Sequence, residues 1–88
     1  MSSSNYIDDA DNFHVVGEVE NGSPSVIRYV EVECTFYDAD KRVVATSSSY
    51  TNPSYLNPGI KAPFEIILLS GSVPVKQINN YTLAVIYQ

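Results

Sequence analysis

A two-residue alternation of apolar and polar side chains recurs along this chain of 88 residues. It is clearest within residues 27–37, where one parity holds Val30, Val32, Cys34 and Phe36 and the other holds Glu31, Glu33, Thr35 and Tyr37. Successive side chains of a β-strand point to opposite faces, so this period is typical of strands with one buried face. No stretch of ten or more residues follows the 3.6-residue period of a helix. The chain is therefore predicted to be all-β.

Five strands are expected, at residues 13–20, 27–37, 42–50, 64–69 and 81–88. The second would be about 35 Å long at ~3.3 Å per residue, which predicts a bulge or bend within it. Strands at this spacing indicate a sandwich or a small barrel, and we expect an immunoglobulin-like antiparallel β-sandwich of about five to seven strands. That topology needs one or two further short edge strands, for which residues 50–62 and 72–78 offer room.

Two turns are predicted from their residue types, with Asp38, Asp40, Pro58 and Gly59 as the structural residues. An aspartate at the first position of a turn can accept a hydrogen bond from a backbone amide two or three residues later, which predicts a reversal after Asp38. Pro58 and Gly59 fit the central positions of a type II turn, because glycine supplies the positive φ at the second of them.

Length and composition indicate one small domain over residues 12–88, preceded by a flexible acidic segment over residues 1–11. Ten acidic against five basic residues give a net charge of −5. Binding to the phosphate backbone of a nucleic acid needs a basic face on the protein, and this chain cannot supply one. Nucleic acid is therefore excluded as a partner. No apolar run approaches the roughly 20 residues of a membrane span, and we expect no membrane insertion by this domain. We also expect a monomer without cofactors.

The single histidine and the single cysteine are of types that often act in catalysis or bind metals, but neither is expected to do so here. His14 is the only histidine and shares the outward parity of its strand with Glu18 and Glu20. No second histidine or thiolate can join it in a metal site, so it is interpreted as a solvated strand residue. Cys34 lies on the apolar parity, without the basic neighbourhood that makes a thiol reactive, and is predicted to be buried. The predicted sets of catalytic, cofactor-binding and metal-binding residues are empty, and the domain is not expected to be an enzyme.

The acidic residues near the start of the chain have a second interpretation. Asp8, Asp9 and Asp11, with Asn12, partly match a calcium-binding loop, which alternates oxygen ligands along the chain. The third alternating ligand is missing because that position is Phe13. A solvated acidic linker is the preferred interpretation, and a calcium-dependent adhesion domain is kept as an alternative.

Four glutamates fall on the outward parities of consecutive strands: Glu18, Glu20, Glu31 and Glu33. If those two strands pair, like charges face one another unless a basic residue or a bound cation relieves them. A glycosidase-type carboxylate pair needs a cleft, which a flat sheet does not provide. The charges are expected to discourage aggregation.

Tyrosine is unusually frequent, with seven in the chain. Tyr50 and Tyr55 flank Asn52-Pro53 and form a candidate binding patch, since amphipathic rings are over-represented at recognition surfaces. Tyr81 and Tyr87 fall on the inward parity of the last strand.

Two N-glycosylation sequons begin at Asn21 and Asn80. The first lies in a predicted turn, where a glycan would fit. Such tripeptides often arise by chance, so they give only weak support for export.

Several short segments between residues 16 and 87 form a recognisable set: Val16-Gly17-Glu18-Val19-Glu20-Asn21, Thr35-Phe36-Tyr37-Asp38-Ala39-Asp40, Val43-Val44-Ala45-Thr46, Leu56-Asn57-Pro58-Gly59 with Pro63-Phe64, and Tyr81-Thr82-Leu83 with Val85. Together they resemble the FxLYD family of prokaryotic domains. The family's Phe-x-Leu-Tyr-Asp corresponds to residues 34–38, where Cys34 replaces the first aromatic residue and Phe36 replaces the leucine. Lys41 stands where the family often has a hairpin glycine.

The resemblance implies an immunoglobulin-like sandwich of the kind found in exported or envelope-anchored proteins of archaea and bacteria, with no established catalytic residues. We therefore expect an extracytoplasmic, non-catalytic structural or interaction module whose partner is a protein or an envelope component. A ligand-binding module that uses exposed tyrosines to bind protein or carbohydrate is the first alternative. The calcium-dependent adhesion domain follows it, and a hydrolytic enzyme is the least favoured.

Overall fold

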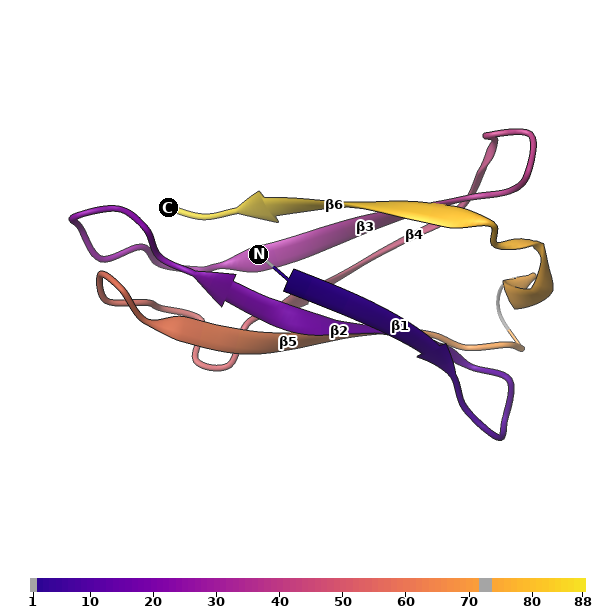
Figure 1. Ribbon diagram of the computed structural model, residues 1–88, viewed down its shortest axis with the longest axis horizontal. Helices are drawn as coiled ribbons and strands as arrows, with labels where there is room; N and C mark the ends of the chain where they lie inside the picture. Colours follow the sequence, from indigo (N-terminus) through magenta and orange to yellow (C-terminus); the bar gives the residue numbers. More distant parts are fainter. Residues whose placement is uncertain (1, 72–73) are drawn as a thin grey trace.

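The computed structural model describes residues 2–71 and 74–88, which form two stacked antiparallel sheets (Figure 1). The strands of this part of the chain are β1 (Ser2–Ile7), β2 (Phe13–Glu20), β3 (Glu31–Tyr37), β4 (Val43–Tyr50), β5 (Lys61–Leu68) and β6 (Asn80–Ile86), and one short 3-10 helix, η1, spans Val75–Gln77. One sheet has the order β1-β2-β5 and the other β4-β3-β6. The predicted all-β sandwich is confirmed.

The two sheets place β2 beside β5 and β3 beside β6, which is the pairing of the central strands in an immunoglobulin-like sandwich. At one side of the sandwich β4 lies against β5, and the amide of Asn52 donates to the Pro63 carbonyl at 3.1 Å. At the other side β1 and β6 are the edge strands of their sheets. No helix within the described residues is both long and apolar enough to cross a membrane.

The core lies between the sheets. It is filled by the side chains that the two-residue alternation predicts to point inward. Its largest fully buried side chains are Phe36, Leu56, Ile66, Val15, Val30, Val32 and Cys34. The rings of Phe13 and Phe36 join the two sheets edge to face, with centroids 5.6 Å apart and an interplanar angle of 82°. Burial of these apolar side chains is the main term that stabilises the sandwich.

The segment over residues 1–11, expected to be flexible, contains β1. The strand pairs antiparallel with β2 from Ser2 opposite Glu18 to Ile7 opposite Phe13. All six of its residues are exposed. The sequence gives no sign of this strand, because its exposed side chains leave no apolar alternation.

The strand expected over residues 27–37 is shorter than predicted. β3 begins at Glu31, because Tyr29 adopts a left-handed conformation with φ of 53°. Before this break, Ile27 forms an isolated antiparallel bridge with Leu56. The predicted irregularity within the strand is present as a register shift between Phe36 and Tyr37.

The two other segments considered for edge strands contain no full strand among their described residues. Residues 50–62 take part in the Leu56 bridge and supply the ends of β4 and β5. In residues 72–78 the structure has η1, and Ser72 and Val73 lie outside the described residues.

Both turn sequences reverse the chain in the structure. Asp38 Oδ1 accepts the amide hydrogens of Asp40 at 2.8 Å and Arg42 at 2.9 Å, which links β3 to β4. Lys41, in the same turn, has a φ of 66°.

In the second turn, the amide of Ile60 donates to the Asn57 carbonyl at 3.1 Å, around Pro58 and Gly59. Gly59 has a φ of 80°, as the second central position of a type II turn requires. This turn leads the chain into β5.

Candidate functional site

The two tyrosines of the candidate patch are exposed at one end of the sandwich. Tyr50 is the last residue of β4 and is 56% exposed, and Tyr55 in the following loop is 59% exposed. The loop between them is held to the chain before β3, because Thr51 donates its amide to the Val30 carbonyl at 3.0 Å and Val30 donates to the Ser54 carbonyl at 2.8 Å. Both ends of the loop are therefore fixed on one buried residue, Val30.

A third exposed tyrosine, which the sequence did not assign to the patch, is next in the chain to the residue that holds this loop. Tyr29 precedes Val30 in the chain, and its side chain is 61% exposed. In a continuous strand over residues 27–37, Tyr29 would share the outward face of Glu31 and Glu33. Its positive φ instead turns the chain before β3 begins. We call Tyr29, Tyr50 and Tyr55 the tyrosine cluster, since each is adjacent in sequence to a member of the Val30, Thr51 and Ser54 hydrogen-bonded set.

The tyrosines of the last strand differ from one another. Tyr81 packs partly buried against the core, with its ring centroid 6.3 Å from that of Phe13, as its inward parity predicts. Tyr87 was also placed on the inward parity, but it lies beyond the end of β6 and is 55% exposed. The alternation stops where the strand stops.

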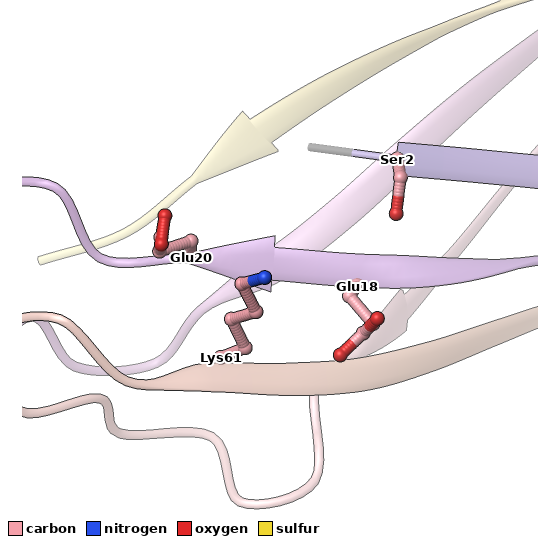
Figure 2. Close-up of a pocket in the computed structure, with 4 residues that line it drawn as sticks. All are labelled: Ser2, Glu18, Glu20 and Lys61. Atoms are coloured by element: carbon pink, nitrogen blue, oxygen red, sulfur yellow. The ribbon is translucent and has the colours of Figure 1, made fainter.

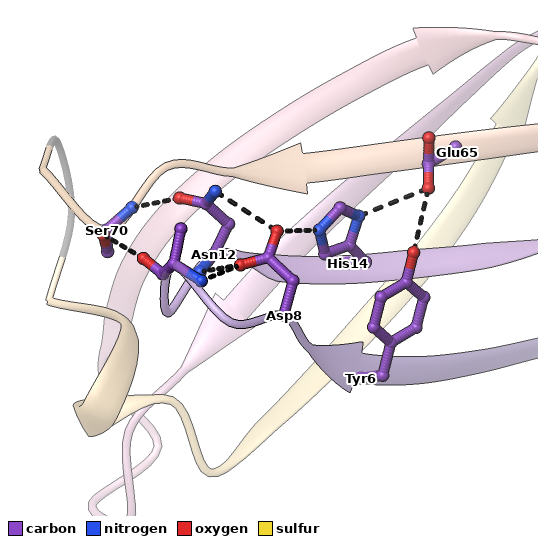
Figure 3. A network of polar contacts seen from close by, with 7 residues as sticks. Tyr6, Asp8, Asn12, His14, Glu65 and Ser70 are labelled. Atoms are coloured by element: carbon purple, nitrogen blue, oxygen red, sulfur yellow. Dashed lines mark hydrogen bonds and ion pairs between the residues drawn. The ribbon is translucent and has the colours of Figure 1, made fainter.

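His14 is enclosed by a polar cluster and does not stand in solvent as expected. Its Nε2 lies 2.7 Å from Asp8 Oδ2 and its Nδ1 lies 3.2 Å from Glu65 Oε2 (Figure 3). The Tyr6 ring stacks on the imidazole with centroids 4.4 Å apart and planes within 5°. Only 11% of the His14 side chain is exposed. We call Tyr6, Asp8, His14 and Glu65 the His14 clasp.

The clasp favours the protonated form of His14. Hydrogen bonding to Asp8 and, less strongly, to Glu65 raises the pKa of His14 against the opposing effect of burial. The bond to His14, followed by the amide of Asn12, lowers the pKa of Asp8 to about 2. An imidazolium donates from both nitrogens. Both ring nitrogens are therefore engaged by the protein's own carboxylates, and neither is free to take a proton from a substrate.

Asp8 also shapes the loop that follows β1. Its Oδ1 accepts the amides of Ala10 at 2.9 Å and Asn12 at 3.0 Å, and its Oδ2 accepts Asn12 Nδ2 at 3.3 Å. The amide of Ser70 donates to Asn12 Oδ1 at 3.0 Å, which ties this loop to the segment after β5 (Figure 3). Both Asp8 oxygens thus already have protein donors, which does not favour the calcium alternative. Within residues 2–71 and 74–88 no group of three or more His, Cys, Asp or Glu side chains is placed to hold a metal ion.

An open depression on the outer face of the β1-β2-β5 sheet is lined by Ser2, Glu18, Glu20 and Lys61 (Figure 2). Glu20 is the register partner of Lys61. The Lys61 ammonium extends between the two glutamates (Figure 2). Lys61 therefore places a positive charge near Glu18 and Glu20 on the same sheet.

The other two glutamates lie on the opposite outer face of the sandwich. Glu31 and Glu33 belong to β3, which pairs with β4 and β6 and not with β2. The like charges that would have faced each other across a pair of strands are thus separated by the whole thickness of the domain. Glu31 lies between Tyr50 and Ile86 in the register of the sheet, next to the tyrosine cluster.

Cys34 is buried in the core, as its parity predicts. Burial raises the pKa of its thiol to about 12. The thiolate is the nucleophilic form of cysteine, so this side chain is a packing residue.

Asn21, the first sequon asparagine, is buried, with 2% of its surface exposed. Its Nδ2 donates to the carbonyls of Ser25 at 2.7 Å and Leu56 at 2.9 Å. The nitrogen that would carry a glycan is therefore occupied in the folded chain, and the expectation that a glycan fits this turn is wrong. Asn80, the second sequon asparagine, is exposed at the start of β6.

Comparisons with known proteins identify no relative: no family model, no curated protein and no solved structure matches this chain. The FxLYD resemblance therefore depends on the sequence motifs alone.

Proposed function

We propose that this domain is a non-catalytic interaction module that binds a protein or an envelope glycan through the tyrosine cluster. Its setting in the envelope or among the secreted proteins of a prokaryote is part of the same proposal and follows only from the FxLYD resemblance. A structural spacer that binds nothing is the competing function.

The observation that carries the proposal is the exposure of three large rings at one end of the domain. Tyr29, Tyr50 and Tyr55 are each more than half exposed, on segments joined through the backbone of Val30. Tyrosine supplies contact area with little loss of side-chain entropy, and it is enriched among the residues that dominate binding energy. A rigid loop also reduces the entropy lost on binding.

The non-catalytic part of the proposal is supported by the state of the two residues best suited to chemistry. The ring nitrogens of His14 are both engaged within the clasp, and Cys34 is buried with a raised pKa. General acid–base catalysis and nucleophilic catalysis each need such a group within reach of a substrate.

The proposal is tested by mapping chemical shifts of the isotope-labelled domain during titration with purified envelope glycans and with fractionated envelope proteins. Binding through the cluster moves the amide signals of residues 28–31 and 49–56 before any others. A triple variant, Tyr29→Asn with Tyr50→Ser and Tyr55→Ser, should abolish these shifts. Asparagine is used at residue 29 because it tolerates positive φ better than serine does.

Ile67→Ser is the matched control, since Ile67 is an exposed apolar residue on the other sheet. It should leave the titration unchanged. Shifts confined to another surface, or shifts that persist in the triple variant, would overturn the assignment of the site. No shift with any fraction would favour the spacer.

A further inference from the structure

Strand β1 is attached to the outside of the sandwich. Every one of its residues is exposed, and none belongs to the buried core. Its backbone pairs with β2 only, because it is the edge strand of the sheet. Edge elements with few buried apolar contacts are the parts of a domain that open most easily.

Side-chain contacts hold β1 at two points besides the backbone pairing. Asn5 Nδ2 donates to the Tyr81 hydroxyl at 3.2 Å, across to the other sheet. Tyr6 stacks on His14, and its hydroxyl lies 3.4 Å from Glu65 Oε2. Asp8, one residue after β1, contacts His14 at 2.7 Å. The clasp therefore joins the end of β1 to both β2 and β5 (Figure 3).

These contacts require an imidazolium. A neutral imidazole has one donor nitrogen and one acceptor nitrogen, so one carboxylate would face a lone pair in place of an N–H. Loss of the proton also removes the positive charge that His14 places between Asp8 and Glu65, so the ring no longer compensates the two acids.

We propose that β1 is a detachable strand controlled by His14: it stays docked while the imidazolium bridges Asp8 and Glu65, and it opens when the ring becomes neutral. The titratable groups that face His14 are Tyr6 from β1, Asp8 from the loop after β1 and Glu65 from β5. Among residues 2–71 and 74–88 the structure has two ion pairs, and His14 makes both of them.

The direction of the effect follows from the pKa of His14, which the clasp raises above its usual 6.5. A group with a raised pKa stabilises the docked strand fully below the usual value, and this contribution is lost as the pH rises through the raised value. Asp8 sets a second limit, since its lowered pKa means that it protonates only as the pH falls toward about 2. Docking is therefore expected to be strongest in mildly acidic solution.

The experiment is amide hydrogen exchange of the whole chain at about pH 5.5 and about pH 8.5, on either side of the histidine titration and corrected for intrinsic exchange rates. Protection of residues 3–7 should fall several-fold at the higher pH, while protection of β3 stays constant. Equal protection of residues 3–7 at both values would overturn the proposal.

His14→Gln is the principal variant, because glutamine donates hydrogen bonds but does not titrate. Its β1 amides should be weakly protected at both pH values, while those of β3 stay protected. Tyr6→Phe is the matched control, which keeps the stacked ring and should keep the pH dependence. A pH dependence that persists in His14→Gln would contradict the role of His14.

One measurement needs no variant. The titration of the His14 ring protons and the pH-dependent shifts of the β1 amides, followed by NMR in the unmodified chain, should share one midpoint. Two clearly separate midpoints would show that His14 does not control the strand.

Discussion

Gly17 lies so close to Ser2 that a Cβ atom at residue 17 would overlap the Ser2 carbonyl oxygen. The same atom would lie 3.0 Å from the ring of the buried Phe64. Glycine at this position therefore allows β1 to approach β2 while Phe64 packs beneath them. The docking of an outer strand thus depends on the absence of one side chain.

Gly17→Ala is expected to displace the start of β1 and to lower the free energy of unfolding by about 1–3 kcal/mol, as overpacking generally does. Urea unfolding and the exchange of the amides of residues 3–5 measure the two effects. Gly22→Ala is the matched control, because a Cβ at Gly22 meets nothing within 4 Å. Similar results for both variants would contradict the close-approach explanation.

The Cys34 thiol is expected to resist modification in the folded protein. Its burial and its pKa of about 12 leave almost no accessible thiolate near neutral pH. An aromatic disulfide reagent should react slowly with the native chain and rapidly in denaturant. Ser48→Cys places a thiol at an exposed site on β4 and should react quickly without denaturant. Fast native labelling of Cys34 would show that the core opens there.

Asn21→Ala is expected to destabilise the fold by about 1–3 kcal/mol, because it leaves buried hydrogen-bonding groups without partners. The lost contacts include those to the carbonyls of Ser25 and Leu56 and to the Ser23 hydroxyl at 2.7 Å. Asn80→Ala, at the exposed sequon, is the control and should change stability by about 0.5 kcal/mol or less. Urea unfolding of the two variants separates a structural asparagine from an accessible one.

Asp8 is expected to lose its contribution to stability in strongly acidic solution. Its pKa is lowered from 3.8 to about 2, so its stabilising effect is complete above 3.8 and is lost as the pH falls through about 2. The stability difference between the unmodified chain and Asp8→Asn should therefore shrink as the pH falls over this range. Thermal unfolding at several acidic pH values measures the difference. Asp9→Asn makes the same change of charge one residue away, and a matching result there would contradict the assignment to Asp8.

The sequence predicts those parts of the fold in which one face of a strand is buried. The alternation within β2, β3 and β5 identifies their buried residues, because each pattern depends only on the pleat of its own strand. β1 gives no such signal, since its side chains face solvent and its pairing with β2 is tertiary. The break at Tyr29 is equally hidden, because hydrogen bonds from Val30 to a distant loop hold it.

The candidate functional residues also divide into those that the sequence alone places and those that only the fold places. The parity of His14 correctly placed its ring on the outer face of β2, but the outer face there is covered by Tyr6. That cover could be foreseen only by knowing that β1 pairs with β2 and that β5 brings Glu65 to the other side. The exposure of Tyr50 and Tyr55 needed only the recognition of a turn between them, whereas the addition of Tyr29 needed the fold.

An outer strand without core side chains is also a place where the sequence of this domain can change freely. Asn5 and Tyr6 make the side-chain hydrogen bonds of β1, and Gly17 supplies the space that its backbone needs. Residues 2–4 can therefore diverge between related domains, or carry a grafted peptide, as long as the new residues keep the extended backbone. This part of β1 can therefore be replaced, in evolution or by design, without a change in the core.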